Sequence, residues 1–380
     1  MDFELSRSQK EIQEAAKTFA KGEFDKELAQ ELDAKNKFPT KIWKKAGKLG
    51  FLGMHFPEKY SGQDLGLIDS VLVAEEFCRT DSTIGSSLIL AGYAAECLLR
   101  YAGNKLKEKF LPSVAECRMR SSGAFSEPEL GSNLSDISTK ADKNGKDWVI
   151  NGVKSNVFVS DKPGFYCVLC RTDPNKPSEE GMSLILVESD RVGVSRMDLG
   201  TTMGLRMISI SNIVFDEVRV PLSNLIGIEG NGLSQVTTFL DESRIMISAQ
   251  AVGVARGAMD RALEYVKQRE QFATKIIQFQ ITRHKLADMA TKIELSRYIT
   301  YKAATDFDKG VLDSKLASMA KMFSTRSAVE VSDEAIQLFG GYGYMTEYDV
   351  ERFYRDAKFL EIFSGNRDLQ KDTIATSIAG

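Results

Sequence analysis

The chain has 380 residues, with 50 Lys and Arg against 53 Asp and Glu and a formal net charge of -3. Hydrophobic residues make up 43% and charged residues 27%, an ordinary balance for a globular protein. This composition lacks the basic excess of a nucleic-acid-binding surface. The length allows a large core divided into two or three domains.

The segment up to Phe24 predicts an amphipathic helix, with Ser8 and Glu11 as a capping box and apolar residues at helical spacing from Ile12 to Phe19. It lacks the apolar core of a signal peptide, and we find no apolar run long enough to span a bilayer. We therefore expect a cytoplasmic protein, or an organellar one whose transit peptide is not in this sequence.

Cysteine and histidine usage argues against disulfides and metal. Five cysteines are scattered along the chain, and an odd number does not suit a disulfide framework. Cys167 and Cys170 form a CxxC pair without a second ligand pair, so we expect two buried thiols in a strand. With only His55 and His284 present, no metal site is predicted.

The pattern of apolar residues along the sequence changes twice. Residues 1–121 show helical apolar spacing, residues 122–230 are rich in short β runs, and residues 231–380 are helical again. Turn residues at 143–145 and 151–152 separate the β runs and favour a mostly antiparallel sheet. The predicted fold class is α+β, mostly α, with an N-terminal helical domain, a middle sheet domain and a C-terminal four-helix bundle. The expected strand segments are Asp147–Gly152, Asn156–Ser160, Phe165–Thr172, Met182–Ser189 and Ser211–Pro221.

Four segments, in order and with natural spacing, resemble the acyl-CoA dehydrogenases, and the resemblance covers essentially the whole chain. They look like that family's flavin loop, the end of its middle domain, its FAD-binding helix pair and its C-terminal signature. These segments are Gly123–Ala141, Met203–Leu233, Arg269–Met289 and Gln337–Lys358.

The resemblance implies FAD as cofactor and assigns one group of residues to the flavin. Phe125, Ser126 and Ser132 match positions that touch FAD, and their hydroxyl and backbone N–H groups suit its polar edge. Asn156 and Phe158 stand where family members usually carry an aromatic residue and a hydroxyl residue beside the flavin ring. A changed ring contact would alter the redox potential or the substrate's approach.

A second group is implied to reach the FAD of a neighbouring subunit, so the resemblance also implies a dimer, and most relatives are dimers of dimers. An arginine at a pyrophosphate makes a charge-assisted contact, and bare glycine backbone can approach the adenine end closely. We therefore expect a homotetramer. The residues of this group are Arg269, Phe272, Gln280, Gln337, Gly340 and Gly341.

The carboxylate that removes the α-proton in this family is missing from both usual positions. Ser364 occupies the position at the end of the C-terminal signature, and Ser243 occupies the one used by a minority branch. Neither serine can act as a base at neutral pH without an activating partner. Glu242 is one residue from the minority position, a helical rotation of about 100°, and is our leading candidate. Glu361 is an alternative.

The same two segments place Arg244 and Phe363 beside the substrate, by resemblance, and give Asp241 a structural role. The sequence resembles most closely the branch that oxidises prolyl thioesters on carrier proteins. We therefore expect FAD-dependent dehydrogenation of an acyl thioester on a carrier protein or on CoA, with an electron-transfer flavoprotein or O2 as acceptor.

Other functions remain open on the same scaffold. One is a reductase, or an alcohol or amine oxidase, that needs no α-proton base. Another is a non-catalytic flavoprotein subunit that retains FAD without turnover. A nucleic-acid-binding offshoot of the family is disfavoured by the acidic balance of the chain.

Overall fold

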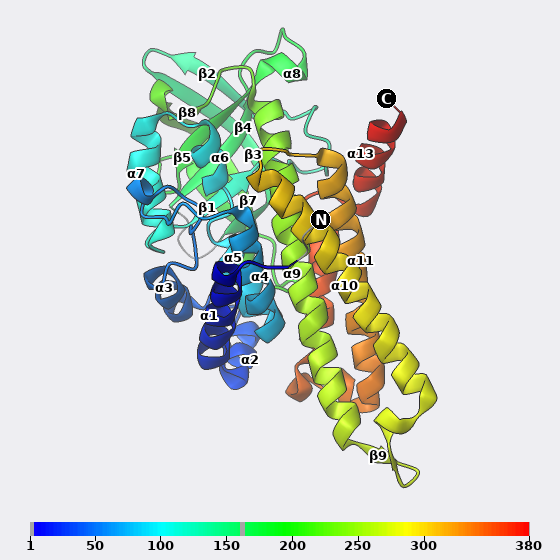
Figure 1. Ribbon diagram of the computed structural model, residues 1–380. Helices are drawn as coiled ribbons and strands as arrows, with labels where there is room; N and C mark the ends of the chain where they lie inside the picture. The colour runs from blue at the N-terminus through cyan, green and yellow to red at the C-terminus, as the bar shows by residue number, and fades with distance from the viewer. Residues whose placement is uncertain (1–3, 160–163, 380) are drawn as a thin grey trace.

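The computed structural model describes residues 4–159 and 164–379, and these form a helical part, a sheet and a second helical part in chain order (Figure 1). The last residue of the predicted strand at 156–160, Ser160, lies outside the described residues. The first part holds α1 (Arg7–Glu23), α2 (Lys26–Ala34), α3 (Thr40–Lys48), η1 (Glu58–Tyr60), α4 (Leu67–Thr80), α5 (Ser82–Leu90), α6 (Ala95–Tyr101) and α7 (Asn104–Ala115).

Helix α1 begins two residues earlier than the predicted capping box would place it. Ser6 is the N-cap, and it forms a reciprocal capping box with Gln9. The prediction of Ser8 and Glu11 was therefore wrong. Sequence pattern alone cannot choose between two capping boxes that are two residues apart, and Ser6 has the extended backbone that an N-cap requires.

The expectation about apolar runs also needs a correction. The stretch Ser82–Tyr101, which spans α5 and α6, is long and apolar enough to cross a membrane by length and composition. However, 72% of it is buried inside the protein, as in the core helix of a globular domain. Its apolar character reflects packing between the other helices and the sheet.

The middle part is an eight-stranded sheet with the strand order β6-β7-β3-β2-β4-β5-β8, in which β1 pairs with β4. It is mostly antiparallel, as predicted, but β1 and β2 each pair with β4 in parallel. Its elements are β1 (Ser121–Ala124), β2 (Lys140–Asn144), β3 (Asp147–Val159), β4 (Phe165–Arg171), α8 (Ser178–Gly181), β5 (Met182–Glu188), β6 (Val194–Asp198), β7 (Ser209–Pro221), η2 (Leu222–Asn224) and β8 (Leu225–Ile226).

Two of the predicted strands are one continuous strand. β3 is 13 residues long, and its register against β7 shifts at two places, between Ile150 and Gly152 and between Lys154 and Val157. The turn predicted at 151–152 is therefore absent. Gly152 is needed there because a Cβ at this position would collide with Thr139, so the glycine marks a close approach of two chain segments within the sheet.

The last part is built on three long helices, which Figure 1 shows running side by side away from the sheet. Its elements are α9 (Gly232–Gln268), β9 (Glu270–Gln271), β10 (Thr274–Lys275), η3 (Ile276–Gln278), α10 (Gln280–Asp308), α11 (Ser314–Phe339), η4 (Gly340–Tyr344), η5 (Thr346–Tyr348), α12 (Val350–Ile362) and α13 (Arg367–Ala379). Helix α12 completes the predicted four-helix bundle by packing against α9 and α11.

One hydrophobic cluster joins all three parts. It contains Leu98 and Phe110 from the first helices, Phe125 and Phe165 from the sheet domain, and Phe239 from the start of α9. Because residues from three separate parts of the chain meet here, a cavity beside this cluster is enclosed by rigid elements on several sides.

Candidate active site

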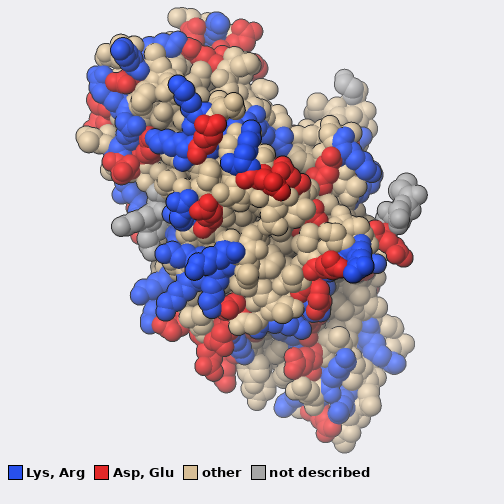
Figure 2. All heavy atoms as spheres, turned by 60° about the vertical axis from the view of Figure 1, so that its left-hand side comes forward, with Lys and Arg blue, Asp and Glu red and all other residues tan. Residues whose placement is uncertain are grey.

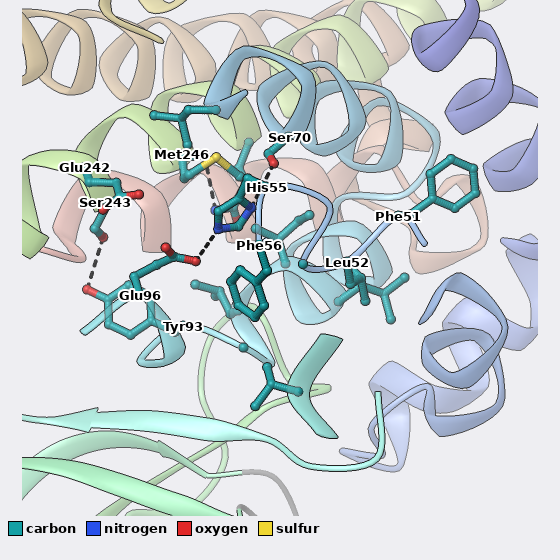
Figure 3. Close-up of a pocket in the computed structure, with 18 of the residues that line it drawn as sticks. Phe51, Leu52, His55, Phe56, Ser70, Tyr93, Glu96, Glu242, Ser243 and Met246 are labelled. Atoms are coloured by element: carbon teal, nitrogen blue, oxygen red, sulfur yellow. Dashed lines mark hydrogen bonds and ion pairs between the residues drawn. The ribbon is translucent and has the colours of Figure 1, made fainter. Parts of the chain in front are cut away.

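A cavity of about 890 Å³, including its opening to solvent, lies between the first helices and α9. Its lining is mostly apolar, and one wall is polar. The polar wall carries His55, Ser70, Glu96, Glu242 and Ser243, which Figure 3 shows around the same space. The apolar lining includes Phe51, Leu52, Phe56, Leu88, Leu90, Val114, Met119, Phe239 and Met246.

Glu242 lies on α9 and is buried against this cavity, with 3% of its surface exposed. Its Oε2 accepts a hydrogen bond from Nε of Arg100 at 2.6 Å. Burial and the nearby Glu96 carboxylate raise the pKa of Glu242 to about 7, although Arg100 lowers it. A carboxyl group with such a pKa is half ionised near neutral pH, which suits a general base or acid.

A second polar pair lies beside Glu242. Nε2 of His55 is 2.5 Å from Oε1 of Glu96, and Nδ1 of His55 is 3.2 Å from Oγ of Ser70 (Figure 3). Burial lowers the pKa of His55, but the Glu96 carboxylate outweighs this effect, so the net shift is upward. His55, Glu96, Glu242 and Arg100 thus form a cluster of mixed charge along one wall of the cavity.

The two predicted base positions, Ser243 and Ser364, meet at one tyrosine. Oγ of Ser243 donates to the Tyr93 hydroxyl at 3.1 Å. The Ser364 hydroxyl is close enough to the same phenol to stabilise its ionised form, but burial dominates and raises the pKa of Tyr93 to about 12. Ser364 has a left-handed backbone, with φ of 57°, and its Oγ is buried without a hydrogen-bond partner. A tyrosine with this pKa cannot activate either serine at neutral pH.

The structure also shows the surroundings of the other residues predicted near the substrate and the flavin. Phe363 and Phe158 pack edge to face with ring centres 4.6 Å apart. Asn156 is exposed at the second register shift of β3, with φ of 53°. Asparagine tolerates this left-handed conformation better than an aromatic residue would. Arg244 is buried and bonds to Asp241, and neither Arg244 nor Phe363 is among the described residues that line the cavity.

The predicted flavin loop is fixed by a buried ion pair that sequence reasoning missed. Lys154 has no exposed side-chain surface, and its Nζ donates to the Phe125 carbonyl oxygen at 3.0 Å and to Oε1 of Glu127 at 2.9 Å. The backbone N–H of Ser155 also donates to the Ser126 carbonyl oxygen, at 2.9 Å.

Glu127 accepts most of the side-chain hydrogen bonds that hold this loop. It accepts further bonds from the backbone N–H and hydroxyl of Ser138 and from the backbone N–H of Thr139. Burial raises its pKa, but Lys154 and these donors hold the pKa at about 2. The sequence held one clue to this ion pair: Lys154 is a charged residue at a position of its strand that faces the protein interior. Ser132, in contrast, is exposed.

The second predicted FAD group lies at the far end of the bundle. A groove there is lined by Arg269, Tyr342, Gly340 and Gly341, and the Arg269 guanidinium lies 5.7 Å from the center of the Tyr342 ring. A Cβ at either glycine would meet no atom within 4 Å, so the groove has room for a ligand. An arginine, an aromatic ring and open backbone fit a pyrophosphate and an adenine. The other predicted members of this group are solvent-exposed, and each is close in sequence to a residue that lines the groove. They are Phe272, Gln280 and Gln337.

The two FAD groups are not brought together within one chain. Phe125 packs against Phe239 near the start of α9, and Arg269 follows the end of that helix. Thirty helical residues separate these positions, about 45 Å at 1.5 Å per residue. Figure 1 shows the sheet at one end of α9 and β9 at the other. The residues of each group fit part of an FAD, but a single FAD is too short to contact both groups in one chain.

The architecture is a sheet domain between two helical domains, with a cavity where they meet. Three domain families match the chain: the acyl-CoA dehydrogenase N-terminal domain at residues 6–118, the middle domain at 122–218 and the C-terminal domain at 230–379. The chain therefore belongs to the acyl-CoA dehydrogenase family. It is a FAD-dependent oxidoreductase of acyl thioesters.

Curated relatives and solved structures match over nearly the whole length. The chain is 36% identical to the probable acyl-CoA dehydrogenase YngJ of Bacillus subtilis, over 100% of both chains. It is 33% identical to the acryloyl-CoA reductase (NADH) of Anaerotignum propionicum, over 100% of this chain and 96% of the relative. Butyryl-CoA dehydrogenase from Megasphaera elsdenii matches with a TM-score of 0.95 and 31% identity, over 100% of both chains. PigA, solved with FAD and proline, matches with a TM-score of 0.94 and 29% identity, over 100% of this chain and 99% of that chain.

Proposed function

We propose that this protein dehydrogenates an acyl thioester at its α and β carbons, with Glu242 as the base. The observation that carries the proposal is the place of Glu242 on the cavity wall. Of the described residues that line this cavity, Glu242 and Glu96 alone are carboxylic acids, and Glu242 directly precedes the serine at the minority base position. Glu361, the alternative, is bonded to Lys358 and does not line the cavity in the described structure.

The residues divide the work as follows. Glu242 takes the α-proton of the substrate in its carboxylate form, and Arg100 holds that carboxylate in place. The apolar walls exclude water, which strengthens the electrostatic interactions within the site. The loop at Phe125 and Ser126 and the groove at Arg269 would hold the cofactor. FAD held there would supply the hydride-accepting chemistry for the β carbon.

The thiol carrier is the finer part of the proposal. We propose a prolyl thioester on a carrier protein as the first substrate to test, because the solved PigA structure contains FAD and proline and shares the fold along the whole chain. An unusual short acyl-CoA is the alternative, which the match to butyryl-CoA dehydrogenase supports. We further propose a cytoplasmic enzyme that passes its electrons to an electron-transfer flavoprotein or to O2.

Assembly is part of the same proposal. Because about 45 Å of helix separates the two FAD groups, a complete cofactor site requires a second chain that supplies Arg269 and its neighbours. Exposed apolar residues at that end of the bundle, including Phe272 at 92% exposure and Tyr344 at 87%, are suited to burial against a partner. We propose a dimer as the minimal unit, and a homotetramer as the complete assembly.

The test is anaerobic mixing of the purified holoenzyme with thioesters, followed by loss of the flavin absorbance. We expect bleaching with wild-type protein and at least about a hundredfold slower bleaching in Glu242→Gln, since a positioned base contributes about 10²- to 10⁴-fold. Glu361→Gln is the matched control and is expected to bleach at the wild-type rate. Unchanged bleaching in Glu242→Gln would refute the assignment of the base, and a protein that no thioester bleaches would be a non-catalytic flavoprotein.

The pH profile gives a second reading of the same experiment. The base must be ionised, and the pKa of Glu242 is about 7. Bleaching should therefore slow about tenfold for each unit of pH below 7 and level off above it. A rate that stays flat from pH 5 to pH 8 would contradict this role.

The reverse reaction is the second candidate, because the chain is 33% identical to an acryloyl-CoA reductase. A carboxyl group with a pKa of about 7 can also donate a proton. Oxidation of the reduced holoenzyme by an α,β-unsaturated thioester, faster than its reduction by the saturated one, would favour this direction.

A further inference from the structure

The cavity contains a serine, a histidine and a glutamate that are joined in a row by hydrogen bonds. Nδ1 of His55 lies 3.2 Å from Oγ of Ser70, and Nε2 of the same ring lies 2.5 Å from Oε1 of Glu96 (Figure 3). All three residues line the cavity, and the proton transfer proposed for Glu242 does not use them. A nucleophile bonded to a base, whose other nitrogen is bonded to a third group, is the arrangement that activates serine in acyl-transfer enzymes.

Glu96 fixes which nitrogen of His55 can act as the base. An ionised carboxylate only accepts hydrogen bonds, so Nε2 carries the hydrogen that Oε1 of Glu96 accepts. In the neutral ring, Nδ1 then has a free electron pair and accepts the hydroxyl hydrogen of Ser70. The His55 ring also packs edge to face on Phe56, with ring centres 4.8 Å apart. The imidazole is therefore held in the orientation and the tautomer that a general base for Ser70 requires.

Three separate elements position these side chains. Ser70 lies in the first turn of α4, Glu96 lies in the first turn of α6, and His55 lies between α3 and η1. The side chains of His55 and Glu96 are 19% and 17% exposed, and Ser70 is buried. Charged groups that are largely excluded from bulk water interact more strongly than exposed ones, so Glu96 stabilises the imidazolium that forms when His55 takes a proton.

Acyl transfer also needs donors for the carbonyl oxygen that becomes negatively charged. Leu52 and Gly53 line the same cavity, and their backbone N–H groups donate to no other backbone group in the described structure. Gly53 has a left-handed backbone, with φ of 75°, and a Cβ there would lie 3.0 Å from Cα of Ala115, so this point of the chain needs glycine. Two adjacent N–H groups without partners are donors of the kind that such an oxygen requires.

We propose that this cavity also hydrolyses acyl esters and thioesters, with Ser70 as the nucleophile, His55 as the general base and Glu96 as the positioning residue for His55. Oγ of Ser70 bonds to the carbonyl carbon while Nδ1 of His55 takes the hydroxyl proton. The carbon–sulfur bond then breaks, and the thiolate leaves with that proton as a free thiol. A water molecule, deprotonated by His55, next attacks the acyl ester on Ser70, and the carboxylic acid leaves while Ser70 regains its proton. One water is consumed and no electrons are transferred, so this activity goes beyond the dehydrogenation and does not need the flavin to react.

The surroundings indicate an apolar acyl group on an anionic carrier. The rest of the cavity lining is mostly apolar. Helix α3 contributes Trp43 to that lining from its buried face, and it carries the exposed residues Lys41, Lys44 and Lys48. Figure 2, which brings the side of α3 forward, shows Lys and Arg side chains gathered on this part of the surface. A positive field of this kind attracts phosphate-bearing carriers such as CoA.

The pH dependence of the hydrolysis follows from the groups around His55. They are Glu96 and Arg100 on α6 and Glu242 on α9. Burial lowers the pKa of His55, but the two carboxyl groups outweigh burial and Arg100, so the pKa lies above its usual value. The neutral, basic form of His55 increases as the pH rises through this pKa, so the rate of hydrolysis should increase with it.

The first measurement separates hydrolysis from dehydrogenation. Benzoyl-CoA and 2,2-dimethylpropanoyl-CoA have no α-hydrogen, and the release of their thiol by the holoenzyme is followed with a chromogenic thiol reagent. We expect release above the rate without protein, and release at least about a hundredfold slower in Ser70→Ala and in His55→Gln, because a positioned base contributes about 10²- to 10⁴-fold. Ser234→Ala, at an exposed serine on α9, is the matched control and should keep the wild-type rate. The proposal is overturned if wild-type protein releases no thiol above the background, or if a folded Ser70→Ala protein keeps the wild-type rate.

A second measurement does not depend on how a variant folds. An alkyl fluorophosphonate bonds to activated serines and releases fluoride, and the modified peptide of the wild-type holoenzyme is identified by mass spectrometry. We expect the phosphonyl group on Ser70, at a rate that falls with the pH because His55 becomes protonated. Modification of other serines only, or of none, overturns the proposal.

Thiol release and flavin bleaching distinguish the two activities. Bleaching by butyryl-CoA without thiol release from benzoyl-CoA or 2,2-dimethylpropanoyl-CoA would leave the dehydrogenase function intact and refute the hydrolysis. Thiol release by Ser70 without bleaching by any thioester would support the hydrolysis and refute the dehydrogenase function.

Discussion

Replacing Lys154 with methionine tests whether the buried ion pair sets the shape of the predicted flavin loop. The change removes the cation from Glu127 and the donor from the Phe125 carbonyl oxygen. Breaking a buried ion pair by removing one partner costs about 3–5 kcal/mol. Three donors from Ser138 and Thr139 remain on Glu127, so we expect the lower end, about 3 kcal/mol.

This loss has two measurable consequences. A destabilisation of about 3 kcal/mol corresponds to a fall in Tm of about 4 °C when all 380 residues unfold as one unit, since the unfolding entropy is about 2.1 cal/mol/K per residue. The FAD-to-protein ratio after gel filtration should fall as well, because the Phe125–Ser126 backbone loses its anchor. Differential scanning calorimetry and the flavin absorbance measure the two effects on the same sample.

The matched control is Lys143→Met, which breaks an exposed ion pair with Glu229. A surface pair contributes about 0–1 kcal/mol, so the Tm of this variant should change by no more than about 1 °C. Adding Glu127→Gln to Lys154→Met removes the uncompensated charge and should restore part of the stability. The reasoning is refuted if Lys154→Met and Lys143→Met have equal Tm values, or if the double variant is less stable than Lys154→Met alone.

Two further predictions concern the ends of the cofactor site. Nζ of Lys321 donates to the carbonyl oxygens of Glu361 and Gly365 at 2.8 and 2.7 Å, on either side of Ser364. Lys321→Met should therefore speed backbone hydrogen exchange in this turn and slow flavin bleaching. Unchanged exchange would show that the lysine does not hold the turn. Arg269→Ala should lower FAD retention with an unchanged circular dichroism spectrum, because Arg269 is exposed in the single chain, and full FAD retention in this variant would contradict its assignment to the cofactor.

The catalytic part of the site shows where the sequence was sufficient and where it was not. Glu242 was predicted as the base from its place one residue before Ser243, and the structure puts it on the cavity wall; its role as base remains a proposal. Its partners could not be named. Arg100 and Glu96 lie about 140 residues earlier, and His55 lies earlier still. Only the packing of α6 against α9 and the contact of His55 with Glu96 bring them together.

The sequence by itself determined the order of helical and β segments and the family, since these depend on local pattern and on motifs that are contiguous in the chain. The residues of both FAD groups are predictions from the same motifs. The tertiary structure alone decided that the strand at Asp147–Val159 is continuous, because Gly152 is required by contact with Thr139 and not by a turn. It also decided that a buried lysine bonds to Phe125 and Glu127 in the predicted flavin loop, and that one wall of the cavity is polar. Burial, unpaired atoms and the charge around Glu242 are properties of residues distant in sequence, and they exist only once the chain has folded.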